Sequence, residues 1–393
     1  MKILIFIPLL LLLGLPVLAV EIPEADGSDG VFNPTTNIQV NTRWAAVTNW
    51  NASSPVSGQG VYDPEKHVVV YKYASVNIPA GVTVSFTENI RSAPVVWLVE
   101  SNVIIDGTIQ LSASGSRSGA GGYKTYALGV GRMKGGTGYG GGTRQSTLGR
   151  HNEESSNLSI GSAQAYGNAS LVPLYGGSSG SNRSGTTSSG AGGGGGGAIL
   201  IAAKGTITHN GAVLVQGTGT GGSNDKAPGS GGAVRLVAES IVGNGQLNAR
   251  GVGSSGVGRI RVEAVTNMSQ FVYNGPTPSI SKAHESPVTV QPDNFPQCKV
   301  LSVDQRESPT YPLATLDAPD ITVGSTNGVT VVIETRNAAP TTSSVELRIS
   351  PAYQDVEFFP ATHVSGDQGR SLWQVNFNFP LGVTRLQAQL TTE

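Results

Sequence analysis

Cysteine and charged residues are scarce in this chain of 393 residues. Cys298 is the only cysteine, so the chain cannot form an internal disulfide, and a buried small apolar residue is the simplest interpretation of it. Charged residues make up 13% of the chain, about half the usual share, and the net charge is −1. Nothing in this balance predicts binding to nucleic acid or to an anionic membrane.

Histidines and acidic residues are too dispersed to predict a catalytic or metal site. The five histidines show no metal-ligand spacing, so neither a metal nor another cofactor is predicted. His209 precedes an Asn-Gly turn, where we expect it to be exposed. A Ca²⁺-dependent lyase or a hydrolase needs clustered or paired carboxylates, and no repeated segment places two in one outer column. The acids in those segments are Glu100, Asp106, Glu239 and Glu263. No catalytic residue is therefore assigned.

The chain has one long apolar run, at its N-terminus. Residues 1–19 combine a basic Lys2, an apolar stretch over residues 3–13 and a Val17-x-Ala19 cleavage pattern. This pattern predicts a secretory signal peptide over residues 1–19 and a mature chain that begins at Val20. A membrane anchor is the alternative, although the run is shorter than the ~20 residues that a span needs. We therefore expect no membrane span after signal cleavage.

Glycine, by contrast, is abundant, with 54 residues or about twice the usual share. It accompanies a repeat: residues 198–217, AILIAAKGTITHNGAVLVQG, largely return at residues 233–251. A looser copy lies at residues 96–115 and a truncated one at residues 259–264. The Asn-Gly turns of the two best copies lie 244 − 210 = 34 positions apart, which is the period of a supersecondary unit. Strands this short must stack on neighbours, which predicts a right-handed parallel β-helix.

Alternation within the copies predicts which side chains face the core. The expected inward residues are Ile199, Ile201, Val234, Leu236, Ile260 and Val262. The residues expected in one outward column are Trp97, Leu200, Arg235 and Arg261. We predict that Trp97, Arg235 and Arg261 bind an extended partner, either an acidic glycan strand or a second copy of the protein. Alternatively, a glycine-rich segment covers this column, which then serves only as the surface against which that segment packs.

Composition divides the mature chain into successive segments. Residues 20–60 are expected to cap the stack, and residues 61–265 are expected to form the β-helix. A glycine-rich excursion over residues 112–197 interrupts the helix, and we expect it to pack on the flank. Eight prolines mark residues 266–319 as a linker. Residues 320–393 hold about five alternating runs, at the spacing of a small Ig-like β-sandwich. The predicted fold class is therefore all-β.

Six motifs spread over most of the mature chain are distinctive. They are DGSDGVFNP, VYDPEK, VNIPAGVTVSF, APVVWLV, GGGGGGAILIAAKGTIT and GRIRVEAVTN. Together they resemble a family of secreted glycine-rich parallel β-helix proteins of environmental bacteria. The resemblance implies a pectin-lyase-like architecture with a C-terminal Ig-like domain, and export from the cell. It implies no activity and no site residues.

Export, low charge, a repetitive scaffold and a small appended sandwich indicate a functional class. We expect a secreted, non-catalytic structural or adhesive protein of the cell surface or an extracellular matrix. The alternative is a polysaccharide-binding or polysaccharide-cleaving protein of the lyase or hydrolase type, since many parallel β-helices are such enzymes. The expected partners are extracellular polysaccharide or further copies of the protein.

Overall fold

The protein was analysed as a computed structural model, which describes most of the chain after residue 19. The described residues are 20–46, 58–63, 66–88, 92–125, 127–128, 131–132, 138, 141, 165–181, 192–219, 227–253, 255–281, 294–309, 319–351 and 354–392. Within these ranges the chain is all-β with almost no helix, since η1, Thr42–Ala46, is a single 3₁₀ segment. The expected signal peptide, residues 1–19, lies outside the described residues.

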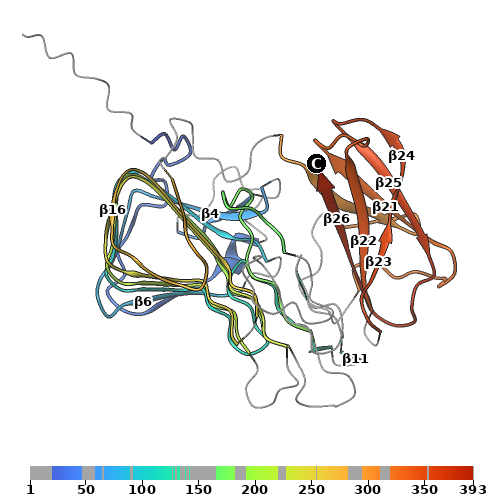
Figure 1. The fold of residues 1–393 in the computed structure, drawn as a ribbon, viewed down its shortest axis with the longest axis horizontal. Helices are drawn as coiled ribbons and strands as arrows, with labels where there is room; N and C mark the ends of the chain where they lie inside the picture. The colour runs from blue at the N-terminus through green and yellow to red at the C-terminus, as the bar shows by residue number, and fades with distance from the viewer. Residues whose placement is uncertain are drawn as a thin grey trace, which may run out of the picture.

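Residues 31–281, here called the parallel region, form two large sheets whose neighbouring strands run parallel, β3 excepted (Figure 1). The ten-stranded sheet contains β1 (Val31–Phe32), β3 (Val61–Asp63), β4 (Val68–Tyr73), β5 (Ser75–Ile78), β7 (Val95–Val99), β8 (Val103–Ile105), β12 (Ala198–His209), β14 (Ala233–Gly243), β16 (Arg259–Ser269) and β18 (Ser279–Ser281). The six-stranded sheet contains β2 (Ile38–Val40), β6 (Thr83–Phe86), β9 (Thr108–Gln110), β13 (Ala212–Leu214), β15 (Gln246–Asn248) and β17 (Val272–Asn274).

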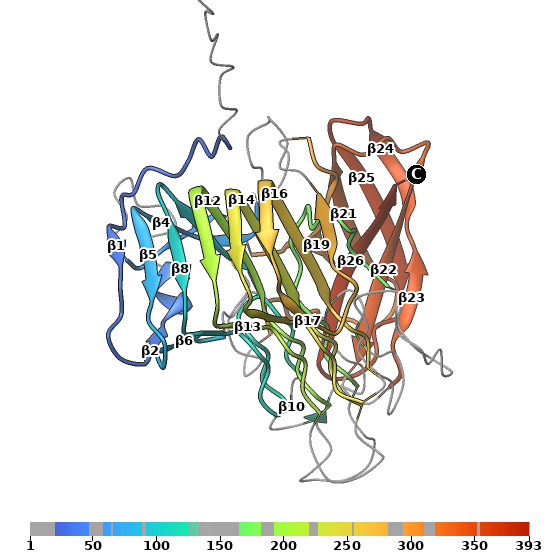
Figure 2. The ribbon, with the colours of Figure 1, turned by 60° about the vertical axis from the view of Figure 1, so that its left-hand side comes forward.

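The two best copies each contribute one strand to each sheet, whereas the looser copy contributes β7 and β8 to the ten-stranded sheet and β9 to the six-stranded sheet. In the best copies, β12 and β14 hold both apolar runs, and the Asn-Gly turn leads into β13 and β15. Copies pair in register, with Ile201 opposite Leu236 and Leu236 opposite Val262. Figure 2 shows β1, β5, β8, β12, β14 and β16 side by side in this order. The sequence repeat is thus a repeat of strands along one stack.

The core of the parallel region lies between its sheets, and the six residues predicted to face it do so. Ile199, Ile201, Val234, Leu236, Ile260 and Val262 are at most 2% exposed and belong to one apolar cluster. The prediction for Trp97 is wrong, because Trp97 pairs with Ile201 rather than with Leu200. A one-residue difference in register moves a side chain to the other face. Trp97 is therefore fully buried in the core, and Val96 occupies the outward position.

His209 is also inside, contrary to the expectation that it is exposed. It ends β12 opposite Ile105, which faces the core, and its own exposure is 0%. Its Nε2 lies 3.1 Å from the Gln246 carbonyl oxygen, and its ring meets Phe271 edge-on at 5.1 Å. Burial is the largest influence on the pKa of His209 and lowers it. The imidazole is thus held neutral within the stack.

Glycine-rich segments pack tightly on one flank of the parallel region. The Gly177 amide donates to the Gly196 carbonyl at 2.8 Å, and the Gly196 amide donates to the Ser230 carbonyl at 2.9 Å. A Cβ on Gly195 would collide with the Gly177 carbonyl. Three segments distant in sequence therefore approach one another backbone to backbone, which only glycine permits. The described parts of the 112–197 excursion also include the antiparallel strands β10 (Ala127–Leu128) and β11 (Gly131–Arg132), which pair with each other.

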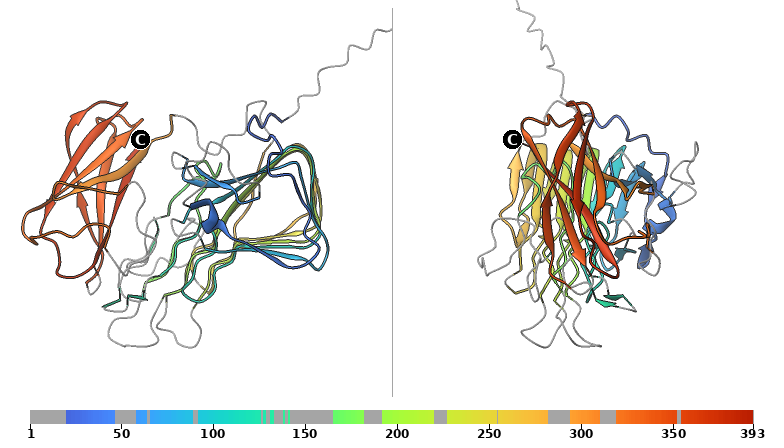
Figure 3. Two further views of the ribbon diagram at one scale, coloured as in Figure 1. Left: turned by 180° about the vertical axis from the view of Figure 1, so that it is seen from behind. Right: turned by 90° about the vertical axis from the view of Figure 1, so that its right-hand side faces the viewer.

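Residues 297–392, here called the C-terminal unit, form two antiparallel sheets around a second core. One sheet contains β19 (Gln297–Val303), β20 (Arg306–Glu307), β21 (Val329–Arg336), β24 (Thr362–Gly366) and β25 (Ser371–Phe377). The other contains β22 (Ser343–Pro351), β23 (Glu357–Pro360) and β26 (Thr384–Thr392). Figure 3 shows this unit beside the parallel region, with the first and last strands of the stack on either side of it.

Strands also lie in the two segments that were expected to be a linker and a cap. The proline-rich segment 266–319, in which residues 288–290 and 299–303 were expected as strands, contains β17, β18 and β19. The prolines lie outside these three strands, so they do not interrupt the pairing. Likewise, the expected cap, residues 20–60, includes β1 and β2, which pair parallel to β5 and β6 and so extend the two sheets.

Candidate functional site

The outward column predicted to bind a partner is covered by other parts of the chain. Val96 and Leu200 are fully buried, and Arg235 is 6% exposed. They lie under two separate segments, one near the described N-terminus and one in the glycine-rich excursion. The apolar residues that share this cluster are Val20, Ile22, Ala25, Leu171 and Leu174. Lys204 fixes the first segment, since its Nζ donates to the Ala25 carbonyl at 2.7 Å. The column is therefore a packing surface.

Arg235 and Arg261 are brought together, and both form an ion pair with one carboxylate, that of Glu263. The Glu263 Oε1 lies 2.8 Å from the Nε of Arg235 and 3.3 Å from that of Arg261. The two Nη groups of Arg261 donate to the hydroxyls of Ser279 and Ser281, both at 2.6 Å, and so tie β18 to β16. All three charged side chains are at most 14% exposed. This arrangement holds strands together and presents little to a ligand.

Sequence reasoning missed the role of Glu263 because it compared residues within one column only. Glu263 stands in the adjacent outward column, opposite Val237. Side chains of adjacent columns on the same face are within reach of long residues such as arginine. The available signal was the spacing Arg261-Val262-Glu263, which puts the two charges on one face of β16.

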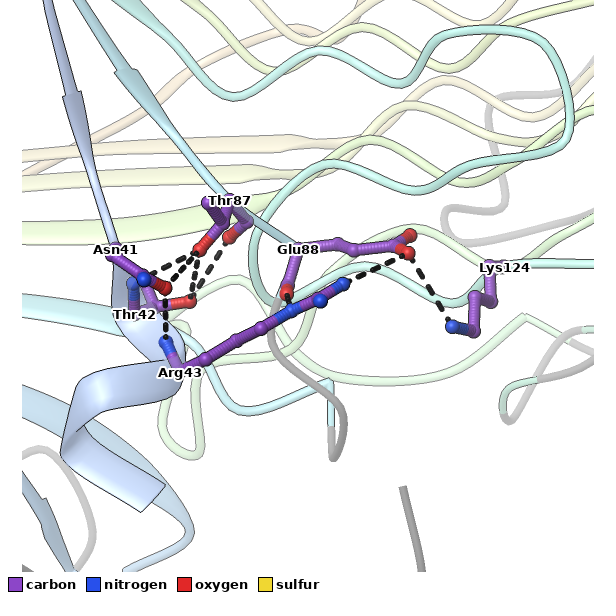
Figure 4. Close-up of polar contacts among 6 residues, drawn as sticks. All are labelled: Asn41, Thr42, Arg43, Thr87, Glu88 and Lys124. Atoms are coloured by element: carbon purple, nitrogen blue, oxygen red, sulfur yellow. Dashed lines mark hydrogen bonds and ion pairs between the residues drawn. The ribbon is translucent and has the colours of Figure 1, made fainter. Parts of the chain in front are cut away.

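A second cluster of charges lies where β2 and β6 end (Figure 4). Glu88 Oε1 lies 3.5 Å from Arg43 Nη2 and 3.4 Å from Lys124 Nζ. Thr42, next to Arg43, donates from its hydroxyl to the Thr87 carbonyl at 2.9 Å. One carboxylate thus joins the 3₁₀ segment η1 to the start of the glycine-rich excursion. The Glu88 side chain is 15% exposed, so it serves mainly to position these segments.

A third cluster of charges, in the described part of the C-terminal unit, has exposed cations. Glu334 on β21 receives Nε of Arg336 at 2.9 Å, Nε of Arg370 at 2.7 Å and Nζ of Lys299 at 3.3 Å. The Glu334 side chain is 3% exposed, whereas the three cations are 54–60% exposed. Burial alone would raise the pKa of Glu334, but the hydrogen bonds and charges of Arg370 and Lys299 hold it below its usual range. The cluster carries three positive charges around one negative charge.

Both arginines of this cluster use Nε to hold Glu334, so the carboxylate fixes the direction of each guanidinium. Their Nη groups remain on side chains that are more than half exposed. Guanidinium groups bind carboxylates, sulfates and phosphates in a bidentate manner. The cluster of Lys299, Glu334, Arg336 and Arg370, here called the basic cluster, can therefore accept an anion from solvent.

The C-terminal unit also has a pocket of about 210 Å³ at the other end of β25. Its lining includes Phe359, Phe377, Gln354, Glu357 and Asn378. The Phe359 and Phe377 rings stack on each other at 5.2 Å, and Phe377 is only 7% exposed. Little aromatic surface is thus left for a ligand such as a sugar ring.

Two further candidates for reactive chemistry are the Cys298 thiol and a metal site. Cys298 is partly buried against the C-terminal core, and its desolvation raises the pKa of the thiol to about 12. Among the described residues, no three His, Cys, Asp or Glu side chains are grouped so that they could hold a metal ion. Across the same residues, no helix has the length and hydrophobicity that a bilayer crossing requires.

The comparisons with known proteins add no functional assignment. The chain matches no protein-family model, and neither a curated protein nor a solved structure is significantly similar to it. Among the ion-pair clusters of the described residues, the basic cluster has the most exposed cations and is the candidate site for a partner.

Proposed function

We propose that the protein is an exported structural or adhesive protein without catalytic activity, active at the cell surface or in an extracellular matrix. In this proposal the parallel region is a right-handed β-helix and the C-terminal unit is an Ig-like sandwich. The signal-like residues 1–19 support export. The continuous parallel ladders support a β-helix, because successive repeats add strands in parallel to the same two sheets.

The structural role is supported by one observation: three parts of the chain that are distant in sequence pack together on one stack of strands. These parts are the described N-terminal segment, the glycine-rich excursion and the C-terminal unit. The described N-terminal segment and the glycine-rich excursion cover the outer face of this stack. The C-terminal unit is attached through Arg348, whose Nη1 donates to the Gly138 carbonyl at 3.1 Å and whose Nη2 donates to the Gly141 carbonyl at 3.3 Å. A chain that uses its largest faces for internal packing is suited to bear load or to present an appended unit.

The adhesive role would fall to the basic cluster, in place of the column of Arg235 and Arg261. Its orientation by Glu334 and its exposure suit an acidic polysaccharide, whose carboxylates or sulfates the Nη groups of Arg336 and Arg370 would bind. Lys299 would add a third positive charge to the same surface. Attraction of this kind weakens as salt screens exposed charges.

A binding assay on an array of acidic and neutral glycans tests this proposal. We expect Arg336→Ala with Arg370→Ala to lose binding to acidic glycans at low salt, and wild-type binding to fall as salt rises. The matched control, Arg117→Ala with Arg250→Ala, removes two exposed arginines from the parallel region and should bind as wild type does. Equal binding by both double variants would overturn the adhesive role. Glycan cleavage by the purified protein would favour the lyase or hydrolase alternative instead.

A further inference from the structure

Exposed apolar residues gather at the two ends of the parallel region. Among the described residues, eleven large apolar side chains are exposed. Six of these eleven lie on the first or last strands of the stack, namely Val31, Ile38, Val265, Met268, Val272 and Ile280. Isolated exposed apolar residues are normal on a protein surface, but a concentration on particular strands marks an interaction surface.

The same ends carry sheet edges that no described strand covers. In the six-stranded sheet, β2 is the strand at one end and β17 is the strand at the other. In the ten-stranded sheet, β1 lies at one end, and at the other end the second half of β16 extends past its short partner β18. The ten-stranded sheet also contains a row of strands formed by β4, β7 and the first half of β12. The first edge of this row is not open, because β3 pairs antiparallel with β4. The open edges are therefore β1 and β2 at the first end, and β16 and β17 at the last.

The two ends match each other in register. Successive pairings place Ile38 in one inward column with Val84, Ile109, Val213, Leu247 and Tyr273. The same pairings place Gln39 in one column with Asn274. In the ten-stranded sheet, Phe32 shares an inward column with Asn267. A second copy moved along the stack would thus set Ile38 against Tyr273 and Phe32 against Asn267. Its strands would run in the direction that a parallel ladder needs.

The described edge strands β1, β2 and β17 lack two of the features that usually prevent strands from pairing between molecules, charged residues and proline. Natural edge strands are protected by charged residues, by proline or by a covering segment. The strands β1, β2 and β17 read VF, IQV and VYN, with no charge and no proline. The C-terminal unit stands beside the stack and leaves both ends clear of itself (Figure 3).

We propose that the protein binds a second copy of itself head to tail, with β2 of one copy pairing with β17 of the next and β1 pairing with the free edge of β16. This proposal rests on the proposed structural role and names its partner. The contact is heterologous, because each copy uses different strands at its two ends. Such contacts repeat without closing unless a rotation brings them into a ring, so they produce linear assemblies.

The test uses the mature chain and two variants that each block one end. Ile38→Lys places a charge in the inward column of β2, and Val272→Lys places one on β17. We expect wild type to form assemblies whose mass rises with concentration in sedimentation velocity and light scattering. Each variant alone should remain a monomer. An equimolar mixture of the two should form a dimer and no larger species, because only one pair of intact ends is available.

Controls separate assembly from folding and from glycan binding. Circular dichroism checks each variant, and Val31→Lys serves as a second block at the first end, since Val31 is 67% exposed. Leu381→Lys, on an 85% exposed residue of the C-terminal unit, should assemble as wild type does. A wild type that is monomeric at all concentrations, or folded end variants that still assemble alone, would refute stacking. Glycan binding that persists in monomeric variants would leave the proposed adhesive role intact.

Discussion

At the scale of single residues, a shared carboxylate has different consequences according to how far its cations are exposed. Glu88, Glu263 and Glu334 each lie within ion-pair distance of at least two cations. Around Glu263, Arg235 is 8% exposed at its side chain, so the ion pair serves packing. Around Glu334, Arg336 is 54% exposed and can meet a partner. Exposure, and not the type of residue, separates the structural pair from the candidate binding cluster.

Burial of His209 predicts a loss of stability in mild acid. Its pKa in the folded chain is lowered below the ordinary value of 6.5, chiefly by desolvation. The unfolded chain therefore binds a proton that the folded chain does not, once the pH falls below about 6.5. The contribution of the neutral His209 to the free energy of unfolding is complete above that pH, and it declines as the pH falls toward the pKa of His209 in the folded chain. Urea unfolding at about pH 8 and about pH 5 measures the decline.

The variant His209→Leu isolates this contribution. Leucine cannot take up a proton, so the variant should lose less unfolding free energy than wild type between the two pH values. For each protein, the unfolding free energy near pH 8 serves as the baseline from which the loss at lower pH is measured. A difference in packing between leucine and histidine therefore cancels in the comparison. Identical pH dependence of the two proteins would show that His209 does not contribute.

At the scale of elements, alternation along β12, β14 and β16 was enough to predict the inward residues, because Arg235 and Arg261 mark the outward phase. In β7 all five residues, Val95–Val99, are apolar and buried, so no charged residue in this strand shows which side chains face outward. The position of Trp97 could not be derived for that reason. The basic cluster could not be predicted from the sequence either, since Lys299, Glu334 and Arg370 meet only through the pairing of β19, β21 and β25.

Close backbone packing of the glycine-rich segments predicts that they tolerate no side chain. A Cβ on Gly196 would collide with the Val215 carbonyl, which belongs to a neighbouring segment and cannot rotate away. We expect Gly196→Ala to lower the unfolding free energy by ~1–3 kcal/mol, the usual cost of overpacking. Gly324→Ala is the matched control, because its Cβ would meet nothing within 4 Å. Equal urea midpoints for the two variants would mean that the glycine-rich segments can accommodate a side chain at Gly196.

At the scale of the whole molecule, the core between the sheets of the parallel region and the core of the C-terminal unit do not merge among the described residues. The contact between the two parts uses Arg348, which is 2% exposed and directs both Nη groups to carbonyls of the glycine-rich excursion. Burial, with a further contribution from Arg385, lowers the pKa of Arg348 to about 9. Arg348 therefore joins the C-terminal unit to the glycine-rich excursion.

Removal of the Arg348 guanidinium should loosen this attachment without unfolding the parallel region. Arg348→Met keeps much of the apolar volume but leaves the Gly138 and Gly141 carbonyls without these donors, a loss of ~1–3 kcal/mol for buried polar groups. We expect differential scanning calorimetry to show the C-terminal unit melting at a lower temperature, while the parallel region melts as before. Arg306→Met, on an exposed residue of β20, should change neither transition. An unchanged thermogram for Arg348→Met would show that the two parts are held together by other contacts.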